Sequence, residues 1–264
     1  MAHKLFILST GPGGTDKITG EVLRDLNECS VVVGYRPYLE DIKEIIKNKE
    51  TYTSGMTEEI DRCNYAIESA LAGKTTALIS NGDAGVFGMA SLALELAANK
   101  VTALQIEIII RPGVTSFLSA AAKAGAPAGQ DFALISLSDR LTDIKVIEKR
   151  LQAALEADFV LGIYNPVSRT RKEPYSIFLN ILNKTRDPKT PVIVASNLDR
   201  ENEVIQKITV EELIRHGFEL PHLNMSTMII TGNSNTFYTK NGFAITPRGY
   251  FHKYDTDGKK LKSL

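Results

Sequence analysis

Short apolar runs alternate with helical stripes along most of the chain. Thr75–Ile79, T-T-A-L-I, has the length and β-branched content of a buried strand. The next segment, Met89–Ala98, is rich in Ala and Leu and predicts a helix. The same order recurs in the first half of the chain, where we expect further strands at Lys4–Ser9, Ser30–Val33 and Ile106–Ile110. This alternation predicts an α/β fold with a largely parallel sheet.

The first helix follows the glycine-rich segment after residue 9. Thr15 or Asp16 is expected to cap it, and Ile18, Val22, Leu23 and Leu26 keep its apolar period. Further helices are expected around Ile42–Ile46 and over Glu58–Leu71. A helix of small residues is expected after Arg111–Ser116 and ends at Ala124.

The pattern restarts after Gly125–Gly129, G-A-P-A-G, which we interpret as a hinge. Strands are expected at Phe132–Leu137, Phe159–Tyr164, Pro191–Ser196, Glu203–Ile208 and Met225–Thr231, with helices at Asp143–Ala157, from Pro174, and at Val210–Arg215. The sequence therefore predicts two α/β domains, residues 1–126 and 127–247, and a tail at 248–264. The polar and aromatic stretch from Thr246 is expected to pack loosely.

Composition narrows the function classes. Lys plus Arg and Asp plus Glu both number 31, so the chain lacks the basic excess of a nucleic-acid or membrane-surface binder. No apolar run approaches the length of a membrane span. Cys29 and Cys63 form no C-x-x-C pair and are expected to be reduced thiols in a cytoplasmic protein. The four histidines show no ligand spacing, so no protein-bound metal is expected.

Glycine-rich turns follow three of the expected strands, at Gly11–Gly14, Ser80–Ala90 and Arg111–Ser116. Glycine allows positive φ angles and close approach of the backbone to a ligand, and such turns are where an open α/β sheet binds ligands. The alternative for Ser80–Ala90 is a tight turn in which Asp83 caps the next helix. The G-x-G-x-x-G and G-x-x-x-x-G-K-[S/T] spacings are both broken, which disfavours dinucleotide and phosphate-loop sites.

The charge of Asp83 points to the chemistry of the ligand. A carboxylate inside the turn repels phosphate, whereas S-adenosylmethionine carries a sulfonium and no phosphate. The residues therefore favour S-adenosylmethionine, with S-adenosylhomocysteine as the product.

Six motifs together resemble the tetrapyrrole (corrin/porphyrin) methyltransferases of cobalamin biosynthesis. They are G-P-G-G, G-Y-R-P-Y, S-N-G-D-A-G-V-F-G-M-A, R-P-G-V-T-S, Y-N-P-V-S-R-T-R and T-P-R-G-Y, and they span Leu5 to about Tyr250. The pattern is most similar to the branch that methylates C17 of precorrin-3B or cobalt-precorrin-3 and contracts the ring. Asn81 and Phe87 depart from the family pattern, which has a small residue and Tyr there.

The resemblance implies a homodimer with a cofactor trough between two α/β domains. It implies cofactor contacts from Gly82, Asp83, Ala84, Val86, Phe87, Thr115, Ser116, Phe132, Tyr164, Asn165, Ala195, Thr227, Met228 and Ile229. For Met228 and Ile229, a place in a core strand without cofactor contact is an equally weighted alternative. On the substrate side we expect Gly11, Pro12, Gly13, Gly14, Arg36, Arg169, Arg171 and Arg248, the arginines as partners of substrate carboxylates.

Methyl transfer requires no nucleophilic side chain or metal, because the sulfonium is already activated and the protein has only to position the reactants. Ring contraction needs proton transfers, for which Asp83, Asp139 and Asp199 are candidate general acids or bases, and the sequence does not choose among them. Any cobalt is expected to arrive within the substrate.

Three alternatives stay open. They are a C11- or C20-specific methyltransferase of the same fold, an NAD-dependent oxidoreductase, and a non-catalytic nucleotide-binding module. Also open are the presence of cobalt in the substrate and the oxygen dependence of the route.

Overall fold

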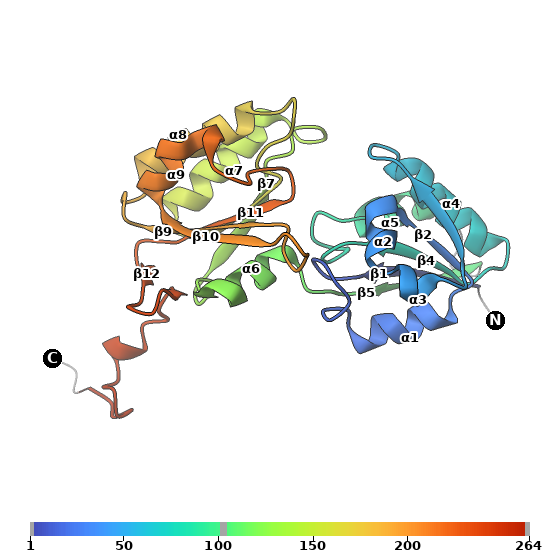
Figure 1. Cartoon of the computed structure of the whole chain (residues 1–264), viewed down its shortest axis with the longest axis horizontal. Helices are drawn as coiled ribbons and strands as arrows, with labels where there is room; N and C mark the ends of the chain where they lie inside the picture. Colours follow the sequence, from blue (N-terminus) through green and yellow to red (C-terminus); the bar gives the residue numbers. More distant parts are fainter. Residues whose placement is uncertain (1–2, 101–104, 262–264) are drawn as a thin grey trace. The chain divides into compact units, whose positions relative to one another are not determined.

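The computed structural model of the chain (Figure 1) describes residues 3–100 and 105–261. Its backbone forms two compact units, described separately below. Unit 1 comprises residues 1–119 and Leu198–Glu201, and unit 2 comprises residues 120–197 and 202–264. The short segment Leu198–Glu201 belongs to unit 1 although it lies between β9 (Pro191–Ser196) and β10 (Val204–Thr209) in the chain.

Unit 1 contains a five-stranded parallel sheet in the order β3-β2-β4-β1-β5. Its strands are β1 (His3–Ser9), β2 (Val31–Tyr35), β3 (Glu50–Ser54), β4 (Thr76–Ser80) and β5 (Ile106–Arg111). Strands β1 and β4 are almost fully buried, as expected for a parallel sheet covered on both faces. The predicted parallel winding is confirmed for this unit.

Helices cover both faces of this sheet. The helices are α1 (Gly20–Glu28), α2 (Arg36–Asp41), α3 (Lys43–Ile46), α4 (Glu59–Leu71) and α5 (Ala90–Lys100). Alternate residues of β1 divide between two cores: Leu5 and Ile7 pack with α4 and α5, whereas Phe6 and Leu8 pack with α1, α2 and α3. The carboxyl ends of the central strands therefore lie between two helical layers, at the edge where such sheets bind ligands.

Unit 2 contains a five-stranded mixed sheet in the order β10-β9-β11-β8-β7. The strands not yet given are β7 (Phe132–Ser136), β8 (Val160–Tyr164) and β11 (Thr227–Thr231). Only the β7–β8 pair is parallel, because β11 runs antiparallel to both β8 and β9, and β9 to β10. The winding of the first unit is therefore not repeated here.

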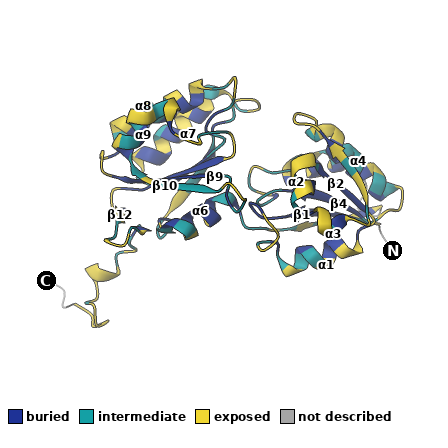
Figure 2. Ribbon diagram, in the orientation of Figure 1, coloured by how far each residue is buried: buried dark blue, intermediate teal, exposed yellow. Residues whose placement is uncertain are grey.

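Three amphipathic helices pack on one face of this sheet: α7 (Ile144–Glu156), α8 (Glu173–Thr185) and α9 (Val210–His216). The apolar stripe of α7, including Ile147, Leu151 and Leu155, lies in the core against strand residues such as Ile163 and Ile229. Figure 2 shows the resulting pattern, with buried strands beneath helices whose outer faces are exposed. Helix α6 (Ser116–Ala124) runs across the boundary between the two units.

A small third sheet includes the start of the predicted hinge and corrects one sequence-based expectation. The predicted hinge begins with β6 (Gly125–Ala126), which pairs with β13 (Ala244–Ile245), and β13 pairs with β12 (Phe237–Tyr238). Thr246 was expected in a loosely packed stretch, yet it is buried, and its hydroxyl donates to the Pro127 carbonyl at 2.5 Å. Loose packing begins only further on, at the exposed Tyr250 and Phe251.

In the first unit one further prediction was wrong and one strand was not predicted. Helix α1 begins later than expected and is capped by Thr19, whose hydroxyl accepts from the Val22 amide at 3.3 Å, instead of by Thr15 or Asp16. Strand β3 was missed, because E-T-Y-T-S lacks an apolar run and forms the polar edge of the sheet. Among the helices of the described residues, none has the length and apolar content required to cross a bilayer.

Candidate functional site

The three glycine-rich turns meet at the carboxyl ends of β4, β1 and β5, which are neighbours in the sheet. The first two are joined by their backbones. The Gly11 amide donates to the Gly82 carbonyl at 3.1 Å, and the Gly82 amide donates to the Gly11 carbonyl at 2.6 Å. The side-chain amide of Asn81 also donates to the Gly11 carbonyl, at 2.8 Å. Turns that are distant in sequence thus form one continuous backbone surface.

Asp83 joins the second turn to the third. One carboxylate oxygen accepts from the Gly85 amide at 2.8 Å, and the other accepts from the Gly113 amide at 2.9 Å. Hydrogen bonds from backbone amides to a carboxylate are charge-assisted and stronger than neutral ones. Asp83 therefore holds the shape of the site, in addition to placing negative charge in it.

Ser9 joins two of these turns, a role that the sequence analysis missed. Its hydroxyl donates to the Arg111 carbonyl at 2.6 Å and accepts from the Ala84 amide at 2.8 Å. The last residue of β1 therefore ties the Ala84 turn to the end of β5. The only signal available in the sequence was its position, directly between a buried strand and a glycine turn.

Two glycines are required by this geometry for different reasons. Gly82 has φ 66°, in the left-handed region that favours glycine. Gly113 has no room for a side chain, because a Cβ there would lie 2.4 Å from the Gly82 carbonyl oxygen and 2.6 Å from the Ser9 Cβ. The close packing of the turns thus depends on the absence of a side chain at residue 113.

The predicted cofactor residues of unit 1 lie along this surface. Ala84 and Thr115 are buried, while Val86 and Ser116 are half-buried. Phe87 is 55% exposed and has φ 52°, so its ring stands at the surface beside the turn. An exposed aromatic ring next to a backbone cradle is suited to pack on an apolar part of a ligand.

The predicted cofactor residues of unit 2 fall into two groups. Phe132, Tyr164 and Asn165 are exposed or half-buried at β7 and the end of β8, and the Asn165 side-chain amide donates to the Ser136 hydroxyl at 3.0 Å. Ala195, Thr227, Met228 and Ile229 are buried in β9 and β11. Ala195 is paired with Met228 in register, and Ile229 lies in the core beneath the helices.

The predicted substrate arginines differ in availability. Arg36, Arg169 and Arg248 are exposed. Arg171 is largely buried: it donates to the Leu137 carbonyl at 2.5 Å, and burial lowers its pKa while the nearby Asp139, 3.7 Å away, opposes that shift. Its guanidinium therefore serves the packing of unit 2 and is not turned outward.

The three candidate acids or bases are all engaged. Asp83 accepts backbone amides, as described above, and Asp139 lies beside Arg171. Asp199 accepts from the Lys17 ammonium at 2.7 Å and from the Ser119 hydroxyl at 2.5 Å. The backbone of Asp199 lies beside the predicted substrate turn, since a Cβ on Gly13 would be 3.0 Å from the Asp199 carbonyl oxygen.

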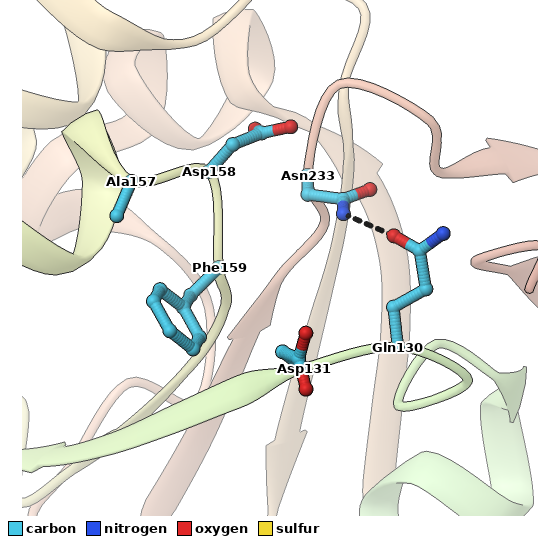
Figure 3. A pocket seen from close by; sticks show the side chains of 6 residues that line it. All are labelled: Gln130, Asp131, Ala157, Asp158, Phe159 and Asn233. Atoms are coloured by element: carbon cyan, nitrogen blue, oxygen red, sulfur yellow. Dashed lines mark hydrogen bonds between the residues drawn. The ribbon is translucent and has the colours of Figure 1, made fainter.

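A cavity of about 220 Å³ lies elsewhere, in unit 2 (Figure 3). Asp131 and Phe159 line it directly before β7 and β8 begin, and Asn233 donates to Gln130 at 3.0 Å across its wall. It thus lies at the amino ends of these parallel strands, opposite to the edge where α/β sheets bind ligands. None of the predicted site residues lines it.

Neither cysteine is placed as a nucleophile. Cys29 and Cys63 are free and buried, on opposite faces of the first sheet. Burial raises the pKa of Cys29 to about 12 and that of Cys63 to about 11, which keeps both thiols protonated near neutral pH. Within residues 3–100 and 105–261, no group of three or more His, Cys, Asp or Glu side chains is arranged to hold a metal ion.

Comparison with known proteins gives one consistent family. The sequence profile of the Tetrapyrrole (Corrin/Porphyrin) Methylases matches residues 4–214. The chain is 40% identical over 246 residues to the probable cobalt-factor III C(17)-methyltransferase of Salmonella typhimurium, covering 93% of this chain and 99% of that protein. It is 39% identical over 258 residues to the cobalt-factor III methyltransferase of Priestia megaterium, but covers only 46% of that longer protein.

Solved structures agree with this result. The crystal structure of the methyltransferase CobJ matches with a TM-score of 0.85 and 32% identity, covering 93% of this chain and 100% of that one. The uroporphyrin-III C-methyltransferase of Thermus thermophilus, solved in complex with S-adenosylhomocysteine, matches with a TM-score of 0.65 and 19% identity, covering 87% and 97%. At that identity the second match supports the fold alone.

Proposed function

Because the chain belongs to the tetrapyrrole (corrin/porphyrin) methylase family, we propose that it is an S-adenosylmethionine-dependent methyltransferase that acts on C17 of cobalt-precorrin-3 or precorrin-3B. The reaction would include contraction of the macrocycle, as a step of cobalamin biosynthesis. The observation that carries this proposal is the match over 99% of a relative named for the C17 reaction. A C11- or C20-specific reaction is the nearest alternative, and no named relative reported above favours it.

The geometry of unit 1 supports the choice of methyl donor. The joined turns bring polar backbone and the carboxylate of Asp83 together, with an exposed phenyl ring at Phe87. Negative charge and neutral polar groups suit a cation with an amino-acid end and a nucleoside, whereas a pyrophosphate would be repelled. The residues present therefore fit S-adenosylmethionine, which supplies a methyl group on an already electrophilic sulfur when bound.

The remaining task of the chain is positioning. Gly82, Asp83, Ala84, Val86 and Phe87, with Thr115 and Ser116, would hold the donor at the carboxyl ends of β4 and β5. The turn at Gly11–Gly14 lies directly beside them and would bind the macrocycle. Holding the two reacting atoms in line removes most of the entropic cost of a bimolecular transfer.

Several implications of the family resemblance remain predictions. They are the cofactor trough between two domains, contacts from Phe132, Tyr164, Asn165, Ala195 and Thr227–Ile229, the homodimer and the cytoplasmic location. We include them in the proposal because the chain matches 99% of the length of a relative named for the C17 reaction.

Anaerobic incubation with S-adenosylmethionine and cobalt-factor III, followed by mass spectrometry, tests the proposed reaction. We expect a product heavier by one methyl group, with the methyl carbon at C17 by nuclear magnetic resonance. A product methylated at C11 or C20 would replace the proposed reaction by its nearest alternative. No methylated product from this substrate or from precorrin-3B would refute the assignment.

Replacing Asp83 by Lys tests the donor site. The variant loses the hydrogen bonds from the Gly85 and Gly113 amides and places a cation where a sulfonium is expected. We expect the affinity for S-adenosylmethionine to fall more than about 100-fold, or about 2.8 kcal/mol. Isothermal calorimetry measures this affinity, and circular dichroism checks that the variant is folded.

The matched control is Glu107→Lys, which makes the same change of charge at an exposed position of β5. Its affinity should equal that of the wild type. Unchanged affinity in the Asp83 variant would contradict the proposed site.

A further inference from the structure

Lys17 lies in a cluster of charged and polar groups that the proposed function does not use. Its ammonium donates to one carboxylate oxygen of Asp199 at 2.7 Å and to the Ser119 hydroxyl at 2.9 Å. The Ser119 hydroxyl donates in turn to the other oxygen of Asp199, at 2.5 Å. The Asp199 side chain is only 10% exposed and that of Lys17 is 32% exposed. Within the cluster, Asp199 is therefore buried in unit 1, whereas Lys17 is accessible to a ligand.

The cluster rests on the glycine turn at Gly11–Gly14. A Cβ on Gly11 would lie 3.2 Å from the Lys17 Cβ, and a Cβ on Gly14 would lie 3.3 Å from the Asp199 carbonyl oxygen. The Gly11 backbone is bonded to Gly82 in the donor site. Lys17 is thus held beside the surface on which the macrocycle is expected to bind.

The hydrogen-bonding capacity of Lys17 is only partly used. An ammonium has three donors, and Asp199 and Ser119 take two of them. The Lys17 side chain is 32% exposed, so the third donor is available to a ligand. Because two partners already fix the ammonium, an anion that binds it loses less side-chain entropy than it would on a free lysine.

A purely structural latch, in which the ion pair of Lys17 and Asp199 only holds the segment Leu198–Glu201 in place, explains this arrangement less well. Arg200 already fixes the same segment to unit 1 through its ion pair with Asp41, at 2.7 Å. Asp199 adopts φ 57°, a left-handed conformation that costs about 1–3 kcal/mol for a residue other than glycine and that occurs preferentially at ligand sites.

We propose that Lys17 binds a carboxylate of the tetrapyrrole, and that Asp199 and Ser119 are positioning residues that orient its ammonium. This inference rests on the proposed function, since it takes the substrate to be a polycarboxylate. It also gives Asp199 a role different from that of a general acid or base, because both of its carboxylate oxygens accept hydrogen bonds within the cluster.

Lys17→Met, Asp199→Asn and the double variant test the inference against a matched control, Lys4→Met. Lys4 is also partly exposed and ion-paired, to Glu28 at 3.3 Å, but on the N-terminal half of β1. Two quantities are measured: the affinity for cobalt-factor III by absorbance titration, and the affinity for S-adenosylhomocysteine by calorimetry. The absorbance titration does not depend on turnover.

For Lys17→Met we expect tetrapyrrole affinity to fall about 10- to 100-fold, the loss of one charge-assisted hydrogen bond. Affinity for S-adenosylhomocysteine should be unchanged. Asp199→Asn should give a smaller loss, and the double variant should be no weaker than Lys17→Met, because Asp199 acts through Lys17. Added salt should weaken tetrapyrrole binding less in Lys17→Met than in the wild type.

Tetrapyrrole affinity equal to that of Lys4→Met would overturn the inference. A parallel loss of affinity for both ligands would also overturn it, since that is the signature of a structural latch. If the wild type binds cobalt-factor III without methylating it, the proposed function fails while the variants still test Lys17. If it does not bind cobalt-factor III at all, both fail.

Discussion

Gly113→Ala should nearly abolish binding of the methyl donor. The added Cβ would lie 2.4 Å from the Gly82 carbonyl oxygen, 2.6 Å from the Ser9 Cβ and 3.2 Å from the Ser9 carbonyl oxygen. Two of these atoms are backbone and Ser9 is buried, so the clash is relieved only by moving the turns apart. We expect a fall of about 100-fold or more in affinity for S-adenosylhomocysteine, or about 2.8 kcal/mol. Overpacking should also cost about 1–3 kcal/mol of stability.

Gly20→Ala is the matched control for this substitution. Gly20 opens α1, and a Cβ there would meet only the Arg24 side chain, at 3.7 Å. The control should bind the donor normally and be more stable by about 0.5–1 kcal/mol, because Ala favours the helix. Calorimetry with S-adenosylhomocysteine compares the two variants. Equal affinity in both would show that close packing of the turns is not required for binding.

Arg186→Met should produce a large loss of stability in unit 2. The buried guanidinium donates to the carbonyls of Gly232, Leu155 and Phe159 at 3.1, 2.7 and 2.8 Å, and pairs with Asp158 at 3.3 Å. Burial lowers the pKa of Arg186, with Asp158 opposing the shift. Removing it leaves three carbonyls without this donor and Asp158 without its cation, at a cost of about 3–5 kcal/mol.

Urea unfolding followed by circular dichroism measures this effect. Arg215→Met serves as the control, because Arg215 is 64% exposed and pairs with Glu212 at 3.9 Å. Such a surface pair contributes at most about 1 kcal/mol. A loss of less than 1 kcal/mol in Arg186→Met would show that the three carbonyls find other partners.

The strands and turns of the first unit were largely predictable because their signals are local. Thr75–Ile79 is apolar and β-branched, and the observed strand, Thr76–Ser80, is displaced from it by one residue. Glu50–Ser54 carries no such signal, since a polar edge strand is defined by its neighbour β2 and not by its own residues. The antiparallel β11 was predicted as a strand, but its direction depends on long-range pairing that periodicity does not encode.

The candidate site shows the same division. Asp83 was found from its position in a glycine turn and interpreted through its charge, but its bond to the Gly113 amide, 30 residues away, required the structure. Ser9 and Lys17 gave no motif signal, because the contacts that they make depend on the adjacency of β4, β1 and β5 and on the segment around Asp199. The sequence predicted which residue types lie in each turn, but not the long-range contacts that bring the turns together.

A crystal structure of the chain grown with S-adenosylhomocysteine tests the central claim most directly. We expect the ligand at the carboxyl ends of β4 and β5, in contact with the backbone of Gly82–Val86 and the ring of Phe87, with the Asp83 bond to Gly113 intact. A ligand bound away from these turns, or crystals that take up a pyrophosphate-bearing nucleotide there instead, would contradict the account.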